Sequence, residues 1–245
     1  MIDRKIRTAQ VTVPNDGLEI GAYLAEPATD GPFPGIIVIQ EVFGVNSHIR
    51  SVTERIAQAG YVAVAPAIYQ RQAPGFEVGY TDADLALGRT YKEQTKAPEL
   101  LSDIQATIHY LKGRPNVAGQ GFGTIGFCFG GHVVYLAATL PDVKVTASFY
   151  GAGIVTGTPG GGPPTLTLTP HIAGTLYGFF GTQDPLIPNE QVDEIEAALK
   201  KHQISHRIFR YAATHGFFCD QRASYDAQAA QDAWHHVQEL FRLLV

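Results

Sequence analysis

Apolar positions along the chain fall into alternating strand-like and helix-like stretches. Residues 35–40 (GIIVIQ) form a nearly continuous apolar run that ends at a polar residue, which is typical of a strand buried on both faces in a parallel sheet. Residues 47–59 have helical spacing, with Ser47 as the N-cap and Gly60 as the stop. Residues 61–66 (YVAVAP) again have the composition of a strand. Together the three segments predict a β–α–β unit.

The same alternation continues to the end of the chain. Turn-forming residues at 15–17 separate the segments 8–14 and 19–25 and predict an opening antiparallel hairpin. The further predicted strands are 124–128, 145–150, 175–180 and 205–211, and the further predicted helices are 98–112, 130–139, 189–202 and 222–243. This alternation predicts an α/β protein with a mostly parallel sheet, helices on both faces and a single domain over residues 1–245.

Two long stretches interrupt the alternation. Residues 67–97 mix glutamine, arginine, proline, tyrosine and aspartate, and residues 153–171 are rich in glycine, proline and threonine. Both are longer than the usual connection between elements, so we expect them to be mobile or to act as lids over a site.

Composition and charge restrict the partners of the protein. The chain is 45% hydrophobic and 10% aromatic, which is enough apolar material for a sizeable core. It has 18 Lys and Arg against 23 Asp and Glu and no basic block, which argues against nucleic acid and anionic membranes as partners. Two cysteines cannot form a disulfide framework, and we find neither a signal peptide nor a run of the ~20 apolar residues needed for a membrane helix. We therefore expect a cytoplasmic monomer with reduced thiols that acts on a small molecule.

The strongest chemical signal is a G-x-C-x-G sequence at 126–130, centred on Cys128. It lies between a predicted strand and a predicted helix, as the nucleophile elbow of a hydrolase does, with cysteine in the serine position. Side chains in place of the flanking glycines would collide with the neighbouring strand or helix. The helix N-terminus favours a thiolate, and the backbone N–H groups of Phe129 and Val42 are the expected oxyanion donors. The alternative is a buried structural cysteine.

A dinucleotide-binding pattern overlaps this elbow. Residues 121–126 (GFGTIG) match G-x-G-x-x-G. The pattern binds a nucleotide when it forms the turn between a strand and a helix, whereas these residues precede and enter the predicted strand. We therefore expect no nucleotide cofactor.

Two later segments supply the partners that a cysteine nucleophile needs. Asp184 follows the strand 175–180, where Pro185 prevents its continuation, and His215 follows the strand 205–211. The order nucleophile, acid, base is the order along the chain in α/β-hydrolases. His215 would take the thiol proton and later protonate the leaving oxygen, while Asp184 would orient the imidazole. Each residue alone is equally compatible with an ordinary loop.

The remaining histidines are interpreted as structural. His202 and His206 have i,i+4 spacing, but they straddle a predicted helix-to-strand turn and have no acidic partner of the H-E-x-x-H type. We therefore predict no metal site there. His235 and His236 lie in the middle of a predicted helix as surface or packed groups, and His132 packs behind the elbow.

Taken together, the sequence resembles the dienelactone hydrolase (carboxymethylenebutenolidase) family over nearly its whole length. The matching pieces are QEVFG at 40–44, GYVAVAPAIYQRQAPG at 60–75, GFCFGG at 126–131, GTQDPLIP at 181–188 and THGFFCDQRASYDAQAA at 214–230. The resemblance implies an eight-stranded α/β-hydrolase fold. It also implies hydrolysis of dienelactone to maleylacetate in chloroaromatic breakdown, without a metal or other cofactor.

The resemblance further implies roles for several charged residues. Glu41 matches the family's buried glutamate, which is thought to help generate the thiolate when substrate enters; otherwise it is a charged residue at a strand end. Arg222 matches the arginine that binds the substrate carboxylate; otherwise it is a surface arginine at a helix start. Candidates for a second carboxylate-binding arginine are Arg89, close to the expected position, and Arg71. Segment 153–171 is longer than in the family and would cover or reshape the pocket.

These observations predict a cysteine hydrolase that cleaves a small lactone or carboxylic ester through an acyl-enzyme. The nearest alternative is the same machinery acting on an unrelated ester or thioester. A redox protein that uses Cys128 and Cys219, or a non-catalytic module that binds carboxylates, are alternatives from other classes. The sequence contains no C-x-x-C pair, and a redox role would leave the triad unexplained.

Overall fold

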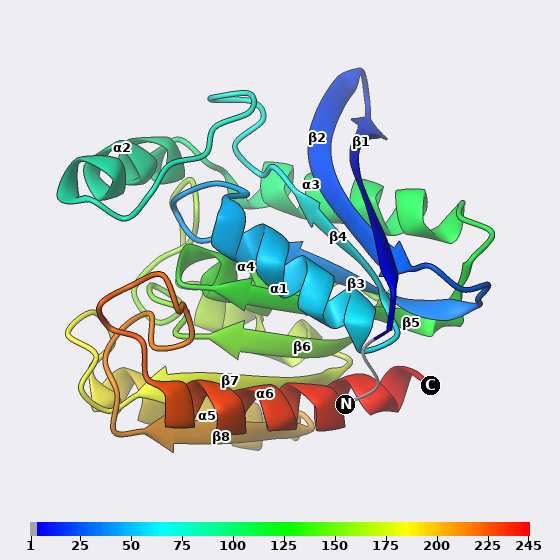
Figure 1. The fold of residues 1–245 in the computed structure, drawn as a ribbon. Helices are drawn as coiled ribbons and strands as arrows, with labels where there is room; N and C mark the ends of the chain where they lie inside the picture. The colour runs from blue at the N-terminus through cyan, green and yellow to red at the C-terminus, as the bar shows by residue number, and fades with distance from the viewer. Residues whose placement is uncertain (1–3) are drawn as a thin grey trace.

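The computed structural model describes residues 4–245, and their strands form one sheet in the order β1-β2-β4-β3-β5-β6-β7-β8 (Figure 1). The strands are β1 (Ile6–Asn15), β2 (Leu18–Pro27), β3 (Phe33–Ile39), β4 (Val62–Pro66), β5 (Val117–Phe127), β6 (Val143–Phe149), β7 (Thr175–Gly181) and β8 (His206–Tyr211). β1 and β2 form an antiparallel hairpin, β2 pairs antiparallel with β4, and the other neighbours are parallel. The predicted fold class is therefore confirmed.

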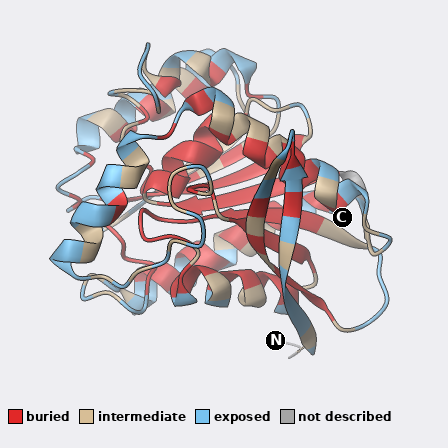
Figure 2. Ribbon diagram, turned by 90° about the horizontal axis from the view of Figure 1, so that it is seen from above, coloured by how far each residue is buried: buried red, intermediate tan, exposed pale blue. Residues whose placement is uncertain are grey.

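Helices cover both faces of this sheet. The helices are α1 (Ser47–Gln58), α2 (Asp82–Glu93), α3 (Ala97–Lys112), α4 (Phe129–Ala137), α5 (Asn189–Lys201) and α6 (Ala227–Phe241), with short 3₁₀ helices η1 (Thr165–His171) and η2 (Arg242–Leu244). In β3, Ile36 and Val38 join an apolar cluster with α1 and α6, whereas Ile37 and Ile39 join one with α3 and α4. Successive side chains of a strand point to opposite faces, so both faces of β3 are apolar. The central strands are accordingly buried (Figure 2), which explains the uninterrupted apolar run.

The stretch 67–97, in which the sequence predicted no helix, contains the helix α2. The hydroxyl of Thr81 accepts the backbone N–H of Asp84, and the Asp84 carboxylate accepts the N–H of Thr81. This reciprocal capping box fixes the start of the helix. Gly88 is the one residue of α2 that is fully buried. The sequence did not reveal this helix because it is marked by its cap, while the apolar stripe that identifies the other helices is weak here.

The second interruption, 153–171, follows a path set by polar contacts. The hydroxyl of Thr165, in η1, lies 2.7 Å from Nε2 of His132 on α4. The backbone N–H of Ala97, at the start of α3, donates to the carbonyl of Pro159 at 2.8 Å. Two helices on the same face of the sheet thus hold the segment in place.

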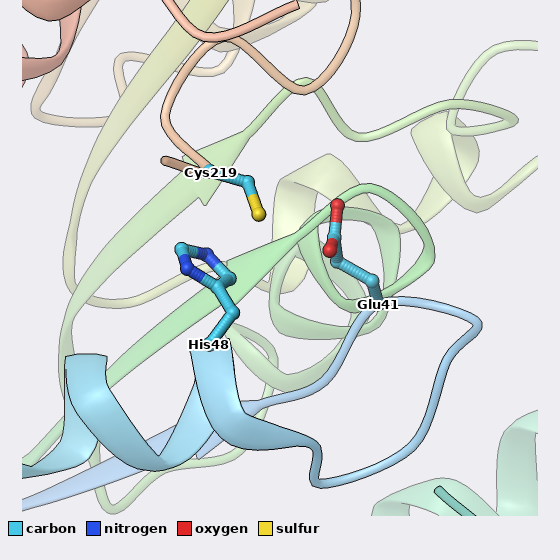
Figure 3. A group of neighbouring side chains, drawn as sticks. All are labelled: Glu41, His48 and Cys219. Atoms are coloured by element: carbon cyan, nitrogen blue, oxygen red, sulfur yellow. The ribbon is translucent and has the colours of Figure 1, made fainter. Parts of the chain in front are cut away.

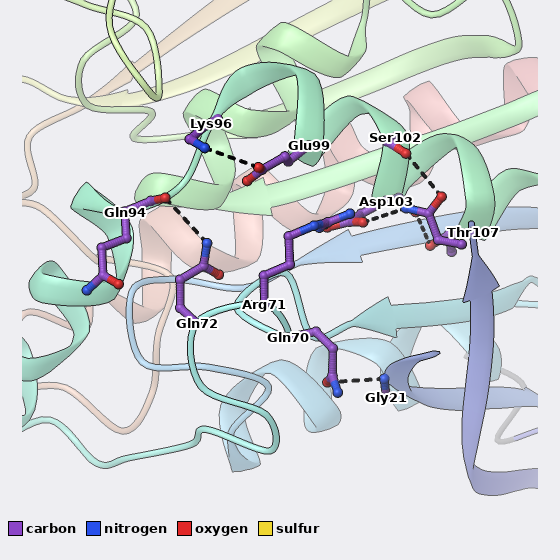
Figure 4. Close-up of polar contacts among 11 residues, drawn as sticks. Gly21, Gln70, Arg71, Gln72, Gln94, Lys96, Glu99, Ser102, Asp103 and Thr107 are labelled. Carbon is purple, nitrogen blue, oxygen red and sulfur yellow. Dashed lines mark hydrogen bonds and ion pairs between the residues drawn. The ribbon is translucent and has the colours of Figure 1, made fainter. Parts of the chain in front are cut away.

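A buried polar network joins the β1–β2 hairpin to α3 (Figure 4). Asp103 of α3 is fully buried, accepts a hydrogen bond from the Asn15 side chain at 2.8 Å and forms an ion pair with Arg71. The Thr107 hydroxyl donates to the Asp103 carbonyl at 2.8 Å. The ion pair of Arg71 with Asp103 is therefore structural, because a buried carboxylate needs a compensating charge.

Replacing Asp103 with alanine is expected to lower the free energy of unfolding by about 2 kcal/mol. The loss is smaller than the ~3–5 kcal/mol for a fully buried pair because Arg71 is partly exposed and can turn to water. Asp142, in an exposed pair with Lys112, is the matched control, and its alanine variant should lose about 0–1 kcal/mol. Urea unfolding measures both, and equal losses would contradict a structural role for the buried pair.

Candidate active site

Cys128 occupies a strained turn between β5 and α4. Its backbone angles, φ 55° and ψ −116°, lie in a sparsely populated region that costs a residue with a side chain about 1–3 kcal/mol. The Cys128 N–H donates to the carbonyl of Phe149 at the end of β6 (3.0 Å), and its carbonyl accepts the N–H of His132 in α4 (3.2 Å). These bonds hold the turn so that the half-buried thiol side chain lines a cavity.

Three glycines around Cys128 allow the close packing of this turn. A Cβ on Gly126 would lie 2.1 Å from the carbonyl oxygen of Gly130, and a Cβ on Gly130 would lie 2.4 Å from that of Gln40. A Cβ on Gly131 would lie 2.3 Å from the carbonyl oxygen of Phe149. The start of α4 therefore rests directly on the backbone at the ends of β3 and β6, where no side chain fits.

Asp184 and His215 meet at the same edge of the sheet, after β7 and β8. Oδ2 of Asp184 lies 2.7 Å from Nδ1 of His215, and both side chains are buried. The other Asp184 oxygen accepts the backbone N–H of Leu186 at 2.8 Å, which orients the carboxylate. The ring of Tyr150 contacts the imidazole edge to face, with 5.0 Å between centroids. The imidazole is therefore held from two sides.

The electrostatics of His215 favour its protonated form. Burial lowers its pKa, but the negative charge of Cys128 and the hydrogen bond to Asp184 raise it more, to about 10. Nε2 of His215 is buried and makes no hydrogen bond to any atom of residues 4–245. An imidazole that is bonded to a carboxylate and lines the same cavity as a thiol is the arrangement that a cysteine nucleophile requires.

The two expected oxyanion donors lie beside the nucleophile. Phe129 is the first residue of α4, where a backbone N–H has no partner within the helix, and Val42 follows β3. Both residues line the cavity that contains Cys128. Gly88 of α2 packs on Val42, since a Cβ there would lie 2.2 Å from the Val42 carbonyl oxygen. Packing of α2 thus fixes the backbone at Val42.

Glu41 and Arg222 form a buried ion pair next to this cavity. Glu41 is inaccessible to solvent, and its Oε1 accepts from Nη1 of Arg222 at 3.0 Å, while Oε2 has no hydrogen-bond partner among residues 4–245. The helix predicted to start at 222 begins at Ala227, with Asp226 as its N-cap, so Arg222 lies in the preceding loop. Gly216 has a φ of +82°, and a Cβ there would lie 2.5 Å from Arg222 Nη1. The guanidinium therefore rests against the backbone beside His215.

The cavity has a volume of about 460 Å³ and is bounded on one side by α2. Arg89 lines it, together with Lys92, which sequence reasoning did not single out. Arg71 is absent from the residues found to line it. Gly153 and Thr156 belong to its wall, so the segment 153–171 shapes the pocket. The capping box of α2 was the signal in the sequence that could have identified this helix. Helical spacing then places Lys92 on the same face as Arg89.

The histidines outside the triad take different roles. Nδ1 of His206 lies 2.6 Å from the Ile204 carbonyl. Burial lowers the pKa of His132 to about 4, which keeps it neutral against Thr165. Among residues 4–245, the three side chains found close enough to share a metal ion are Glu41, His48 and Cys219. His48 was missed because Cys219, one of its two neighbours in this group, lies far from it in the sequence.

A nucleophile turn after the central strand, with an acid and a base after later strands, defines an α/β-hydrolase. The family model of the dienelactone hydrolases matches residues 20–244. The chain therefore belongs to the dienelactone hydrolase family and is an ester or lactone hydrolase. In residues 4–245, no helix is both long and apolar enough to cross a membrane.

Individual relatives agree with this assignment. A Synechocystis sp. protein named "Putative carboxymethylenebutenolidase" is 60% identical over 97% of both chains. A Bradyrhizobium sp. protein named "Probable 2-oxo-3-(5-oxofuran-2-ylidene)propanoate lactonase" is 30% identical over 93% of this chain and 94% of its own. A Klebsiella pneumoniae crystal structure, named as a "Putative Dienelactone Hydrolase", superimposes with a TM-score of 0.88 at 29% identity and covers 97% of this chain and 99% of its own.

Replacing Gly130 with alanine is expected to destabilise the protein by about 1–3 kcal/mol, the usual cost of overpacking. The added methyl group would meet two backbone carbonyls, those of Ile39 and Gln40, which cannot move independently of the sheet. Gly157→Ala is the matched control, because nothing lies within 4 Å of a Cβ at that position. Thermal and urea unfolding of the two variants test this. A Gly130→Ala protein as stable as the Gly157→Ala protein would contradict it.

The raised pKa of His215 predicts a specific pH dependence. A folded-state pKa of about 10 against an ordinary 6.5 means that the stabilisation is complete below pH 6.5 and is lost as the pH rises toward 10. NMR titration should therefore show the His215 ring losing its proton near pH 10. In Cys128→Ser the midpoint should fall, because the negative charge of the sulfur is gone, while in Cys219→Ser it should stay. A wild-type midpoint near 6.5 would refute the ion pair.

Proposed function

We propose that the protein hydrolyses a small lactone or ester that carries a carboxylate, of the dienelactone type, with Cys128 as nucleophile. The observation that carries the proposal is the cavity wall. It combines the thiol and the imidazole of His215 with three cationic side chains, those of Arg222, Arg89 and Lys92, against one acidic side chain, that of Glu93, in a single space of about 460 Å³. A nucleophile and base beside several cations suit an anionic acyl compound.

The proposed reaction has two steps. The Cys128 thiolate attacks the carbonyl carbon, and the backbone N–H groups of Phe129 and Val42 stabilise the oxyanion. Collapse of the tetrahedral intermediate breaks the C–O bond, and the protonated His215 gives its proton to the leaving oxygen. Neutral His215 then takes a proton from water, which attacks the thioester and releases the acid. Asp184 keeps the imidazole in the tautomer that serves both steps.

The Glu41–Arg222 pair would couple substrate binding to activation of the thiol. A substrate carboxylate that binds the Arg222 guanidinium competes with Glu41 for the same donors. A buried carboxylate that loses its counter-charge gains affinity for a proton. Glu41 could then accept the proton of Cys128, so that the thiolate forms when an anionic substrate is present. This extends the role that the family resemblance implies for Glu41.

The relatives support an anionic lactone as the substrate class. The Bradyrhizobium relative bears the name of a lactonase for a propanoate attached to an oxofuran ring, which is a lactone with a carboxylate. The Synechocystis relative bears the name of a carboxymethylenebutenolidase. The same machinery acting on neutral esters or thioesters is the competing proposal. It would not require several cations on the cavity wall.

The first test is the hydrolysis of cis- and trans-dienelactone by the purified protein, with p-nitrophenyl acetate as a neutral ester. Cys128→Ala should abolish turnover of all three compounds, since no other group in the site can form the acyl-enzyme. Retained turnover in this variant would exclude Cys128 as the nucleophile. Cleavage of p-nitrophenyl acetate without dienelactone hydrolysis would retain the nucleophile and assign a different ester.

Replacing Arg222 with glutamine should reduce kcat/KM for dienelactone by about 100-fold, as expected for a charge-assisted bidentate contact worth ~2–3 kcal/mol. The effect on p-nitrophenyl acetate should be several times smaller. Arg89→Gln should show the same preference to a lesser degree. The control is Arg50→Gln, because Arg50 pairs with Glu77 outside the cavity. An equal loss on charged and neutral substrates would show that Arg222 does not recognise the carboxylate.

A further inference from the structure

A second group of reactive side chains shares Glu41 with the Glu41–Arg222 pair. It consists of Glu41 after β3, His48 in α1 and Cys219 in the loop after His215. One ligand atom of each lies within 4.8 Å of the others, and the sulfur of Cys219 lies between the imidazole and the carboxylate (Figure 3). All three residues are buried, with at most 3% exposure. The proposed hydrolysis uses neither His48 nor Cys219.

Two atoms of this group are buried without a hydrogen-bond partner in the described part of the chain. They are Oε2 of Glu41 and Nε2 of His48. Such unpaired buried polar atoms are rare in folded proteins, and each calls for a ligand or ion that satisfies it. The thiol of Cys219 contacts the Tyr80 hydroxyl at 3.3 Å, so the sulfur has one polar neighbour and faces the two unpaired atoms. A ligand that all three atoms could bind would satisfy the group.

The surroundings of His48 resemble the second shell of a metal site. Its Nδ1 lies 3.7 Å from a carboxylate oxygen of Asp220, the residue that follows Cys219. This distance is longer than a hydrogen bond, but it turns Nδ1 toward the carboxylate and Nε2 away from it, which is the ring orientation of zinc-binding histidines whose other nitrogen faces a carboxylate. In His48 the free nitrogen is the unpaired Nε2.

We propose that Glu41, His48 and Cys219 form a zinc site that regulates the enzyme. The ligands would be Oε2, Nε2 and Sγ, which is the mixed oxygen, nitrogen and sulfur set that Zn²⁺ accepts. Zinc–ligand distances of about 2.0–2.3 Å place tetrahedral ligand atoms about 3.5 Å apart, so the side chains must close by about 1 Å. The Tyr80 hydroxyl or a water completes the coordination.

Charge and proton balance are consistent with this ion. Zn²⁺, the Glu41 carboxylate and the Cys219 thiolate sum to zero. The Arg222 guanidinium that pairs with Glu41 leaves one positive charge, which the Asp220 carboxylate 3.7 Å from His48 balances. The Cys219 thiol releases its proton to solvent as the Zn–S bond forms. Burial and the charge of Glu41 raise the pKa of this thiol to about 12. Zinc affinity should therefore increase with pH, because metal and proton compete for one sulfur.

Zinc at this position would inhibit hydrolysis. Coordination by Glu41 removes the carboxylate proposed to accept the Cys128 proton, and it also places a dication next to Arg222. This consequence rests on the proposed function, whereas binding of the metal does not. The two are therefore measured separately.

Binding is tested with the Cys128→Ala protein, which removes the thiol of the triad as a competing metal ligand. Equilibrium dialysis against Zn²⁺ should show one ion per chain, and Co²⁺ should produce the near-ultraviolet band of a thiolate ligand. Adding either Cys219→Ser or His48→Gln should weaken binding at least 100-fold and, for Cys219→Ser, remove the band. Adding His236→Gln, in a surface cluster with Asp232 and Glu239, should change neither result. Absence of stoichiometric binding, or equal binding in the ligand variants, would overturn the proposal.

Inhibition is tested with the Cys128 enzyme and cis- or trans-dienelactone, because only an anionic substrate is proposed to activate the thiol through Glu41. Zinc should suppress turnover and EDTA should restore it, whereas Cys219→Ser and His48→Gln should retain metal-free activity and lose zinc sensitivity. Metal-free activity also shows that each variant folds. Zinc inhibition that persists unchanged in both variants would place the ion at Cys128 and His215 and would refute a regulatory site at the cluster. If no substrate is turned over, the proposed function fails, while the binding experiment still decides the site.

Discussion

The close approach of the first turn of α4 to the ends of β3 and β6 is the constraint on which the site depends. Gly126, Gly130 and Gly131 bring helix and strand backbones to distances that exclude any Cβ. That contact forces Cys128 into a backbone conformation with positive φ, and the strain is balanced by the packing of the surrounding sheet. It also places the N-terminus of α4 against Ile39 and Gln40, shortly before Val42, and both expected oxyanion donors line the cavity that contains the nucleophile.

Around this turn, the parallel sheet gathers side chains that are distant along the chain. β7 and β8 end at the same edge as β5, which brings Asp184 and His215 into a buried pair behind the thiol. The cations come from two different connections, Arg222 from the loop before α6 and Arg89 from α2. The rigid parts of the site thus come from the sheet, and the parts that select a substrate come from the connections, as is usual for this architecture.

Charge in the buried part of the site is balanced in pairs. Asp184 compensates the protonated His215, and Arg222 compensates Glu41. A second anion that enters the cavity changes this balance, which is why substrate binding and thiol activation are coupled in the proposed reaction. The neighbouring group of Glu41, His48 and Cys219 shares one carboxylate with that machinery. An ion bound there would act on catalysis without contacting the nucleophile.

The sequence by itself determined the α/β class, most of the strands and the elbow at 126–130, because full burial, helical periodicity and glycine at a tight turn leave strong local patterns. It also named Cys128, Asp184 and His215, whose roles in the reaction remain proposals. It did not reveal α2, since a helix with one fully buried residue has almost no apolar stripe. Tertiary structure alone decided that Arg89 lines the cavity while Arg71 pairs with Asp103. It alone joined His48 to Glu41 and Cys219, because such contacts depend on the distance between elements and not on spacing along the chain.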